Sequence, residues 1–281
     1  MMQTGTEITS DGDVFFMNVF DGVQAVFARH QLDLVALLCS SEEDSDAYLQ
    51  RMAERRFADA LIISATRRND SRIAFLAARK IPFIALGRSL TDAGHPWLDL
   101  DFETMARAGV ARLVARGHRR IGVLAPQDDI NLGFILVENY RAALEEHGID
   151  FDPALVFRVP PSERGGHQIA RVIAEMPGRP TGLIVASERV TVGVHHGLVE
   201  AGLIPGRDMA LIGRGGPHTR YLRPALTGFS LSLRDLGITL AESLLATMPA
   251  YAAIYPFGLV RKVVPFDLVE GDTDACPPRD S

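Results

Sequence analysis

The chain has 281 residues, of which 47% are hydrophobic and 23% are charged, and its formal net charge at pH 7 is −6. This composition is typical of a globular protein, and the length suits two domains of ordinary size better than one. The acidic balance argues against a large phosphate-binding surface on this polypeptide, although it does not exclude a separate DNA-binding module.

The sequence shows no feature of a membrane or secreted protein. It contains no run of about 18 apolar residues, and its first twelve residues are polar, without the basic and apolar regions of a secretory signal. The only cysteines, Cys39 and Cys276, lie far apart, which favours two free thiols over a disulfide. We therefore expect a cytoplasmic protein.

Helical and strand-like segments alternate through the first hundred residues. Phe16, Val19 and Val23 recur at spacings of three and four, which indicates one face of a helix. The apolar run at 34–38 is typical of a strand that is covered on both faces. We predict helices over 13–31, 46–56 and 71–79, and strands over 34–38, 60–63 and 82–86.

The same alternation continues through the middle of the chain. Asp101 is a suitable N-cap for a helix that ends before Gly117. We predict helices over 102–115, 133–147, 166–176 and 189–201, and strands over 121–125, 156–159, 183–186 and 209–213. Repeated strand–helix–strand units give parallel sheets with helices on both faces, so the fold class is α/β.

The final third departs from this rhythm. We predict extended segments at 226–230 and 259–268, a helix at 233–248, and a disordered polar tail after Gly271. Late elements of this kind are needed if the chain crosses back between two lobes. Two consecutive sheets divided near 98–101 fit the size best, and one large sheet is the alternative.

Four segments together resemble the effector-binding domain of the LacI/GalR family of bacterial transcription regulators. They are Gly-His-Arg-Arg-Ile at 117–121, Asn-Tyr-Arg-Ala-Ala-Leu at 139–144, Ala-Ser-Glu at 186–188 with Asp-Met-Ala-Leu-Ile-Gly at 208–213, and Pro-Ala-Leu-Thr at 224–227. Each motif alone is weak. Their order and spacing extend the resemblance over roughly residues 13 to 272.

The resemblance implies two Rossmann-like lobes of the periplasmic-binding-protein type, with a ligand cleft between them, and a homodimer. It predicts an N-terminal lobe of 1–98 plus 231–256, a C-terminal lobe of 99–230 plus 257–272, and a disordered tail at 273–281. The family places an apolar strand before the first helix and a helix-turn-helix headpiece before that strand. This chain starts with Met1-Met2-Gln3-Thr4 where the loop after that strand is expected, so the headpiece is expected to be absent, and the strand is in question. A part of a longer regulator is the simplest interpretation.

In similar proteins the ligand contacts residues that follow the carboxyl ends of the strands. The resemblance therefore implies a ligand site made of Phe15, Phe16, Arg88, Ile130, Leu132, Leu136, Ser187, Glu188, Arg214 and Gly215. Sugar-binding members usually carry an arginine at the position of Leu136 and an aspartate at that of Gly215. Those two groups clamp neighbouring sugar hydroxyls, and this chain has neither.

The apolar loop side chains and the two arginines suggest a different kind of ligand. Ile130, Leu132 and Leu136 make one side apolar, while Arg88 and Arg214 offer positive charge. We therefore predict a partly apolar or anionic effector, or a sugar derivative, rather than a plain neutral sugar. Two alternatives stay open: Arg88 is paired with a surface carboxylate, and the apolar residues are simply core.

The two adjacent phenylalanines differ in their expected roles. Phe16 belongs to the apolar stripe of the first predicted helix, so we expect it mainly in the core. Phe15 lies off that stripe, which makes it the better candidate for stacking on a ligand, with core packing as the alternative.

Three further motifs do not support chemistry. Gly213 to Gly216 lacks the third glycine of a dinucleotide fingerprint. Adjacent His195 and His196 point about 100° apart on a helix, which is poor geometry for one metal. The acidic pair at 128–129 has no positioned nucleophile beside it. We expect no catalytic residue, no metal and no cofactor.

The sequence thus predicts the effector-sensing and dimerising part of a LacI/GalR-like repressor, which contacts DNA only through the missing headpiece. A solute-binding protein of a transport system is the first alternative, because it shares the lobes and the cleft. A two-lobed α/β enzyme is the second.

Overall fold

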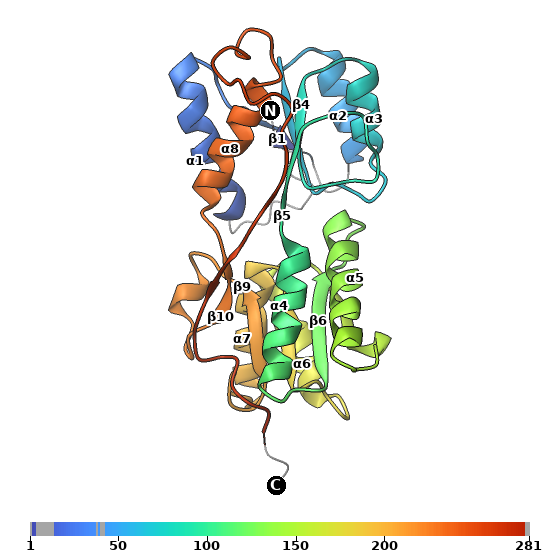
Figure 1. Ribbon diagram of the computed structural model, residues 1–281, viewed down its shortest axis with the longest axis vertical. Coiled ribbons are helices and arrows are strands. Elements are labelled where there is room, and N and C mark those ends of the chain that lie inside the picture. The colour runs from blue at the N-terminus through green and yellow to red at the C-terminus, as the bar shows by residue number, and fades with distance from the viewer. Residues whose placement is uncertain (1, 4–13, 38, 40–42, 279–281) are drawn as a thin grey trace. The chain divides into compact units, whose positions relative to one another are not determined.

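The computed structural model describes residues 2–3, 14–37, 39 and 43–278 (Figure 1). The chain forms two compact units: unit 1 comprises Met1–Leu100 and Ser232–Val264, and unit 2 comprises Asp101–Leu231 and Pro265–Ser281. Each unit has its own six-stranded sheet, so the alternative of one large sheet is wrong. Within the described ranges, no helix is long and apolar enough to cross a bilayer.

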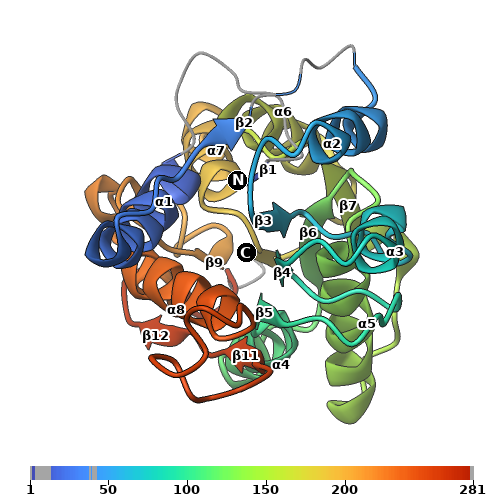
Figure 2. The same ribbon diagram turned by 90° about the horizontal axis from the view of Figure 1, so that it is seen from above.

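Unit 1 is a parallel sheet with helices on both faces. Its strand order is β11-β5-β4-β3-β1-β2, and every pairing is parallel. Figure 2 shows α1 and α8 side by side, and α2 with α3 on the other side of the sheet. The strands are β1 Met2–Gln3, β2 Ala36–Leu37, β3 Leu61–Ser64, β4 Phe83–Leu86, β5 Trp97–Leu100 and β11 Arg261–Val264, and the helices are α1 Val14–Phe27, α2 Ser45–Glu54, α3 Ser71–Ala78 and α8 Leu233–Leu245.

Unit 2 repeats the plan with one antiparallel edge. Its strand order is β12-β10-β9-β8-β6-β7, and only the β10–β12 pairing is antiparallel. Asp101 caps α4, as predicted, by accepting the Thr104 N–H at 2.9 Å. The strands are β6 Ile121–Pro126, β7 Val156–Val159, β8 Gly182–Val185, β9 Ala210–Arg214, β10 Thr227–Ser230 and β12 Asp267–Val269, and the helices are α4 Phe102–Ala115, α5 Asn131–Glu146, α6 Glu163–Glu175 and α7 Glu188–Glu200.

The predicted strand at 34–38 is largely wrong. Only Ala36–Leu37 pairs, at the edge of the sheet, and Val35 is 41% exposed, while Leu38 lies outside the described residues. The family's apolar strand before the first helix, whose presence the sequence left in question, has a two-residue counterpart in β1. Met2–Gln3 pairs between β2 and β3, with Met2 opposite Ile62. The start of the predicted first helix, Asp13, is also outside the described residues.

The last passage between the units also differs from the expectation. The predicted position was 257, but β11 pairs with β5, which keeps the chain in unit 1 as far as Val264. The extended stretch predicted at 259–268 is therefore two strands of different sheets, separated by Pro265 and Phe266. The sequence did not predict β5, because its apolar pattern was interpreted as a boundary between lobes.

The predicted disorder of the tail is wrong for its first residues. Thr273 and Asp274 are 0% and 1% exposed. The Asp274 carboxylate accepts the Thr227 hydroxyl at 2.7 Å, lies 2.7 Å from Nε of Arg116, and is also paired with Arg112. The prediction was wrong because polar composition was taken to indicate a solvated tail. The Asp274 carboxylate is instead bound to partners at α4 and β10.

We expect the change Asp274→Ala to lower the free energy of unfolding by about 1.5–3 kcal/mol, because it removes hydrogen bonds to a charged acceptor. Equilibrium urea unfolding measures this loss. Glu270→Ala is the matched control, since Glu270 also pairs with Arg112, at 3.0 Å, but is 76% exposed. Glu270→Ala should lower the free energy of unfolding by no more than about 1 kcal/mol. Equal losses in the two variants would contradict the buried role of Asp274.

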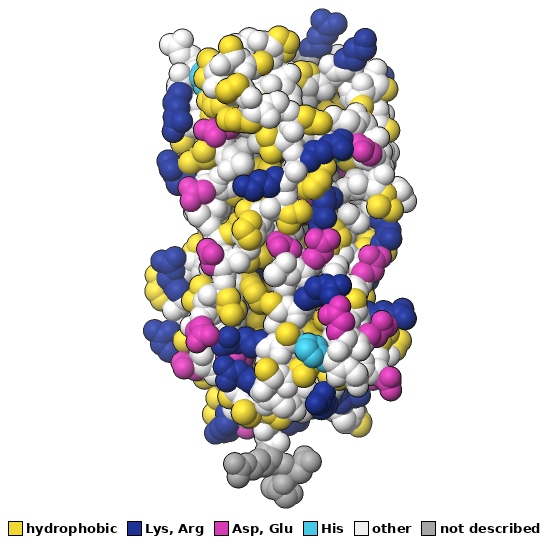
Figure 3. All heavy atoms as spheres, in the orientation of Figure 1, with side chains coloured by type: hydrophobic (Ala, Val, Ile, Leu, Met, Phe, Trp, Pro, Cys, Tyr) yellow, Lys and Arg dark blue, Asp and Glu magenta, His cyan; other side chains and the backbone are white. Residues whose placement is uncertain are grey.

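Charged side chains of both signs are interspersed on the face of the molecule that Figure 3 draws. On the face drawn in Figure 3, lysine and arginine side chains alternate with acidic ones, and no large area carries a single sign. This face therefore lacks the broad basic patch that DNA-binding surfaces show.

Candidate functional site

The carboxyl ends of the parallel strands in unit 2 bring several predicted residues to one edge of the sheet. β6 ends at Pro126, β8 at Val185 and β9 at Arg214, and these strands are neighbours in the order β9-β8-β6. Helices α5 and α7 begin at this edge, directly after β6 and β8. Ligands of α/β proteins bind outside the carboxyl ends of the strands, so this edge is the candidate site of unit 2.

A small apolar hollow lies at this edge. It has a volume of about 30 Å³, and Ser187 is the one polar residue in its lining. Its lining includes Leu132 at the start of α5, Val190 in the first turn of α7, and Pro161, which follows β7. A space of this size holds one small group. The structure therefore brings the predicted Leu132 and Ser187 together around an apolar recess.

Glu188 and Arg214 form a second, buried cluster at the same edge. They are 4% and 8% exposed, and Oε2 of Glu188 lies 4.0 Å from Nη2 of Arg214. Oε1 of Glu188 accepts the backbone N–H of His218 at 2.8 Å. A Cβ on Gly216 would lie 2.0 Å from Glu188 Oε2, so the loop after β9 passes directly over this carboxylate, and a larger residue at 216 would displace the Glu188 side chain. Arg214 therefore has a buried carboxylate beside it, and is not an exposed contact for an anion.

Leu136 must be removed from the candidate residues. It is 0% exposed and belongs to the core, because α5 begins at Asn131 and carries Leu136 one turn further along than Leu132. Ile130 is half-buried at the N-cap of α5, and Gly215 is half-buried after β9. The acidic pair Asp128 and Asp129 is exposed.

In unit 1 the predicted Arg88 is engaged by a carboxylate. Its Nε donates to Oδ2 of Asp99 at 2.8 Å, with the two side chains 23% and 8% exposed. Burial raises the pKa of Asp99 above its usual value, and the bond and charge of Arg88 oppose this shift. The alternative that Arg88 is paired is therefore confirmed, with a buried rather than a surface partner.

Phe15 and Phe16 lie in the first turn of α1. Both are half-buried, and their rings contact edge-on at a centroid distance of 5.1 Å. Phe16 also lies 6.2 Å from the ring of Phe20. Neither ring is fully in the core, so a contact of either one with a ligand stays a prediction.

Sequence reasoning missed further residues at the carboxyl ends of strands. Thr66 and Arg68 follow β3, and the Thr66 hydroxyl donates to the Arg88 carbonyl at 3.0 Å. Pro161 follows β7 and lines the apolar hollow. The signal for all three is their position after the carboxyl end of a predicted strand, which is the feature that the other candidates share.

The remaining polar motifs form no centre for chemistry. His195 is buried and His196 is exposed, as expected for adjacent helix residues. Among the described residues, no group of three or more His, Cys, Asp or Glu side chains is arranged to hold a metal ion. Cys39 and Cys276 are both free thiols.

Comparisons with known proteins agree on the class of domain. The family described as "Periplasmic binding protein-like domain" matches residues 110–273. The HTH-type transcriptional regulator AglR of Rhizobium meliloti is 30% identical over 242 residues, which are 84% of this chain and 67% of that protein. The HTH-type transcriptional regulator RafR of Escherichia coli is 30% identical over 193 residues, which are 69% of this chain and 56% of RafR.

A solved structure shows the same fold. The LacI family transcriptional regulator from Enterococcus faecium, with bound ribose, matches with a TM-score of 0.79 and 22% sequence identity, over 99% of this chain and 98% of that one. The chain thus spans between about half and two thirds of the length of the two curated relatives, and nearly all of the solved domain.

Proposed function

Because the chain belongs to the LacI family of transcriptional regulators and carries its periplasmic-binding-protein-like effector domain, we propose that it senses a small molecule and thereby controls binding to DNA. The relatives are regulators and not enzymes, so we set the enzyme alternative aside together with the transport protein. We propose that contact with DNA is made through a helix-turn-helix headpiece, as the resemblance implies, and not by the two units described above. We further propose that the protein is a homodimer, as the resemblance implies, and that it is located in the cytoplasm.

The proposed effector is partly apolar, and the apolar hollow beside Ser187 is the observation that supports this most directly. An apolar recess favours a ligand that buries a hydrocarbon or aromatic group, by about 25 cal/mol per Å². Support for an anionic group is weaker, because Arg88 and Arg214 both have carboxylates beside them. The residues that we propose to contact the effector lie at the carboxyl edge of the sheet in each unit, Leu136 excepted.

Control of DNA binding requires a differential affinity. An effector changes the activity of a regulator only if it binds one of two conformations more tightly than the other. Moving the population from 1:99 to 99:1 requires a preference of about 5.5 kcal/mol. An apolar group buried in only one conformation contributes directly to such a preference.

Titration calorimetry with matched sugars tests this proposal. We expect phenyl glycosides of glucose and galactose to bind at least about tenfold more tightly than the free sugars, since packing part of an aromatic ring against the apolar hollow and its rim contributes about 1.4 kcal/mol. A neutral monosaccharide that binds as tightly as its phenyl glycoside would refute a partly apolar effector. It would leave the assignment to the family intact.

A further inference from the structure

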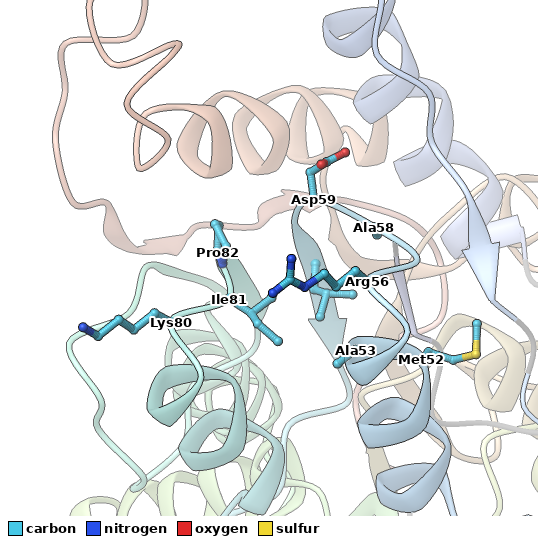
Figure 4. Close-up of a pocket in the computed structure, with 9 residues that line it drawn as sticks. Met52, Ala53, Arg56, Ala58, Asp59, Lys80, Ile81 and Pro82 are labelled. Atoms are coloured by element: carbon cyan, nitrogen blue, oxygen red, sulfur yellow. The ribbon is translucent and has the colours of Figure 1, made fainter.

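A second pocket lies in unit 1, at the edge of the sheet where β3 and β4 begin (Figure 4). Its volume is about 230 Å³, and its apolar lining includes Met52, Leu61, Ile81 and Pro82. Leu61 is the first residue of β3, and Pro82 directly precedes β4. The candidate effector residues follow the carboxyl ends of these strands, so this pocket is at the opposite edge of the sheet.

Three charged residues complete the lining of this pocket: Arg56, Asp59 and Lys80. In Figure 4 the Arg56 guanidinium extends across the pocket toward Ile81 and Pro82, whereas Lys80 and Asp59 point away from its centre. No ion pair within the described part of the chain involves any of these three side chains. A guanidinium therefore lies over an apolar surface without a carboxylate bound to it.

The two cations occupy unusual backbone positions. Arg56 and Lys80 follow α2 and α3 with φ values of 51° and 55°, and each donates its N–H to a carbonyl of the last turn at 3.0 Å. Glycine is the favoured residue at such a helix end, because a Cβ strains this conformation. Helices α4, α5 and α7 do end on glycines with positive φ. After α2 and α3, long basic side chains occupy this position instead.

We propose that this pocket binds a small organic anion, with its carboxylate on Arg56 and its apolar part on Ile81 and Pro82. The planar fork of arginine matches a carboxylate with two parallel hydrogen bonds. The volume is below the roughly 300–1,000 Å³ of pockets for drug-sized ligands, so the anion is of the size of a single ring or a branched aliphatic acid. The regulator then has a second input, separate from the effector site.

Calorimetric titration at low ionic strength tests this with benzoate and its uncharged counterpart, benzyl alcohol. We expect benzoate to bind at least about tenfold more tightly than benzyl alcohol, and Arg56→Gln to weaken benzoate about 10- to 100-fold, as for loss of charged hydrogen bonds. Arg55→Gln is the matched control. Arg55 is adjacent and exposed like Arg56, but it lies outside the pocket lining, so its replacement should leave the affinity unchanged.

A second variant separates ligand binding from a role in ending the helix. Basic side chains at a helix C-terminus also interact with its dipole, which on its own would explain their presence. Arg56→Gly keeps the left-handed turn, so we expect it to abolish benzoate binding while the thermal midpoint stays the same or rises. Three outcomes would overturn the proposal: equal affinities for the two probes, equal losses in the Arg55 and Arg56 variants, or loss of benzoate binding in Leu132→Ala, which would place it at the carboxyl edge of unit 2.

Discussion

Replacing Asp70 by asparagine is expected to lower the free energy of unfolding by about 3–5 kcal/mol, because the change leaves the partner charge buried and unmatched. The side chains of Arg72 and Asp70 are only 3% and 0% exposed. Asp70 accepts the Arg72 Nε at 2.9 Å and its Nη2 at 2.7 Å. An asparagine carries no charge to compensate the guanidinium, and its amide nitrogen would face those donors.

The same pair supports the carboxyl edge of β3. Nη2 of Arg72 donates to the carbonyls of Ser64 and Ala65, and Asp70 accepts the backbone N–H of Arg67 at 3.0 Å. Loss of the carboxylate therefore also loosens the loop that carries Thr66 and Arg68. We expect the unfolding transition of unit 1 to shift more than that of unit 2 in the Asp70→Asn variant.

The pH dependence of stability provides a second measurement on Asp70. Burial alone would raise the pKa of this carboxyl, but the hydrogen bonds and charge of Arg72 outweigh burial and hold the pKa below its usual value. The stabilising contribution is thus fully present above the unfolded value of about 3.9 and is lost as the pH falls through the lower folded value. Urea unfolding between pH 2.5 and 7 should show this loss in the wild type and less of it in Asp70→Asn.

An exposed ion pair serves as the control for the buried one. Asp21 pairs with Arg234 at 2.8 Å, with side chains 65% and 53% exposed. Exposed pairs contribute about 0–1 kcal/mol, so Asp21→Asn should hardly change the unfolding free energy. Similar losses of unfolding free energy in the Asp70 and Asp21 variants would show that burial does not make the Asp70–Arg72 pair more important for stability.

The alternation of elements was predictable because the periodicity of apolar residues is local. The helix at 102–115 and the strand at 156–159 lie where the sequence placed them. The secondary-structure predictions are wrong where the conformation depends on contacts with residues far away in the sequence. An apolar run became the two-residue edge strand β2, and a polar tail was ordered by Arg112 and Arg116. Composition alone does not contain these partners.

In the candidate site, too, features that depend on local sequence were predictable and features that depend on distant partners were not. Its position followed from a general rule about the carboxyl ends of parallel strands, and that rule brought Leu132 and Ser187 to one hollow. The ion-pair partners of the charged residues could not be predicted from that rule. Arg88 comes after β4 and Asp99 lies in β5, so their pairing depends on the parallel contact of two strands, one of which the sequence did not predict. Without β5 the sequence could not decide between a ligand and a carboxylate as the partner of Arg88.

Leu136 and Leu132 provide the test of which α5 residues face the effector. Leu136 is fully buried, so Leu136→Ala should lower the free energy of unfolding by about 2–5 kcal/mol, the transfer and cavity cost of a buried leucine. Leu132 is half-buried and lines the hollow, so Leu132→Ala should lose less than half as much stability.

The effects on binding should be reversed. We expect Leu132→Ala to weaken a phenyl glycoside about tenfold, because the hollow loses apolar contact with the ring, and Leu136→Ala to leave its affinity nearly unchanged at a temperature where both variants are folded. Urea unfolding and calorimetric titration give the free energy of unfolding and the glycoside affinity of each variant. If Leu136→Ala weakened the glycoside while costing little stability, the core assignment of Leu136 would be wrong, and the effector would bind deeper along α5 than the hollow beside Ser187 indicates.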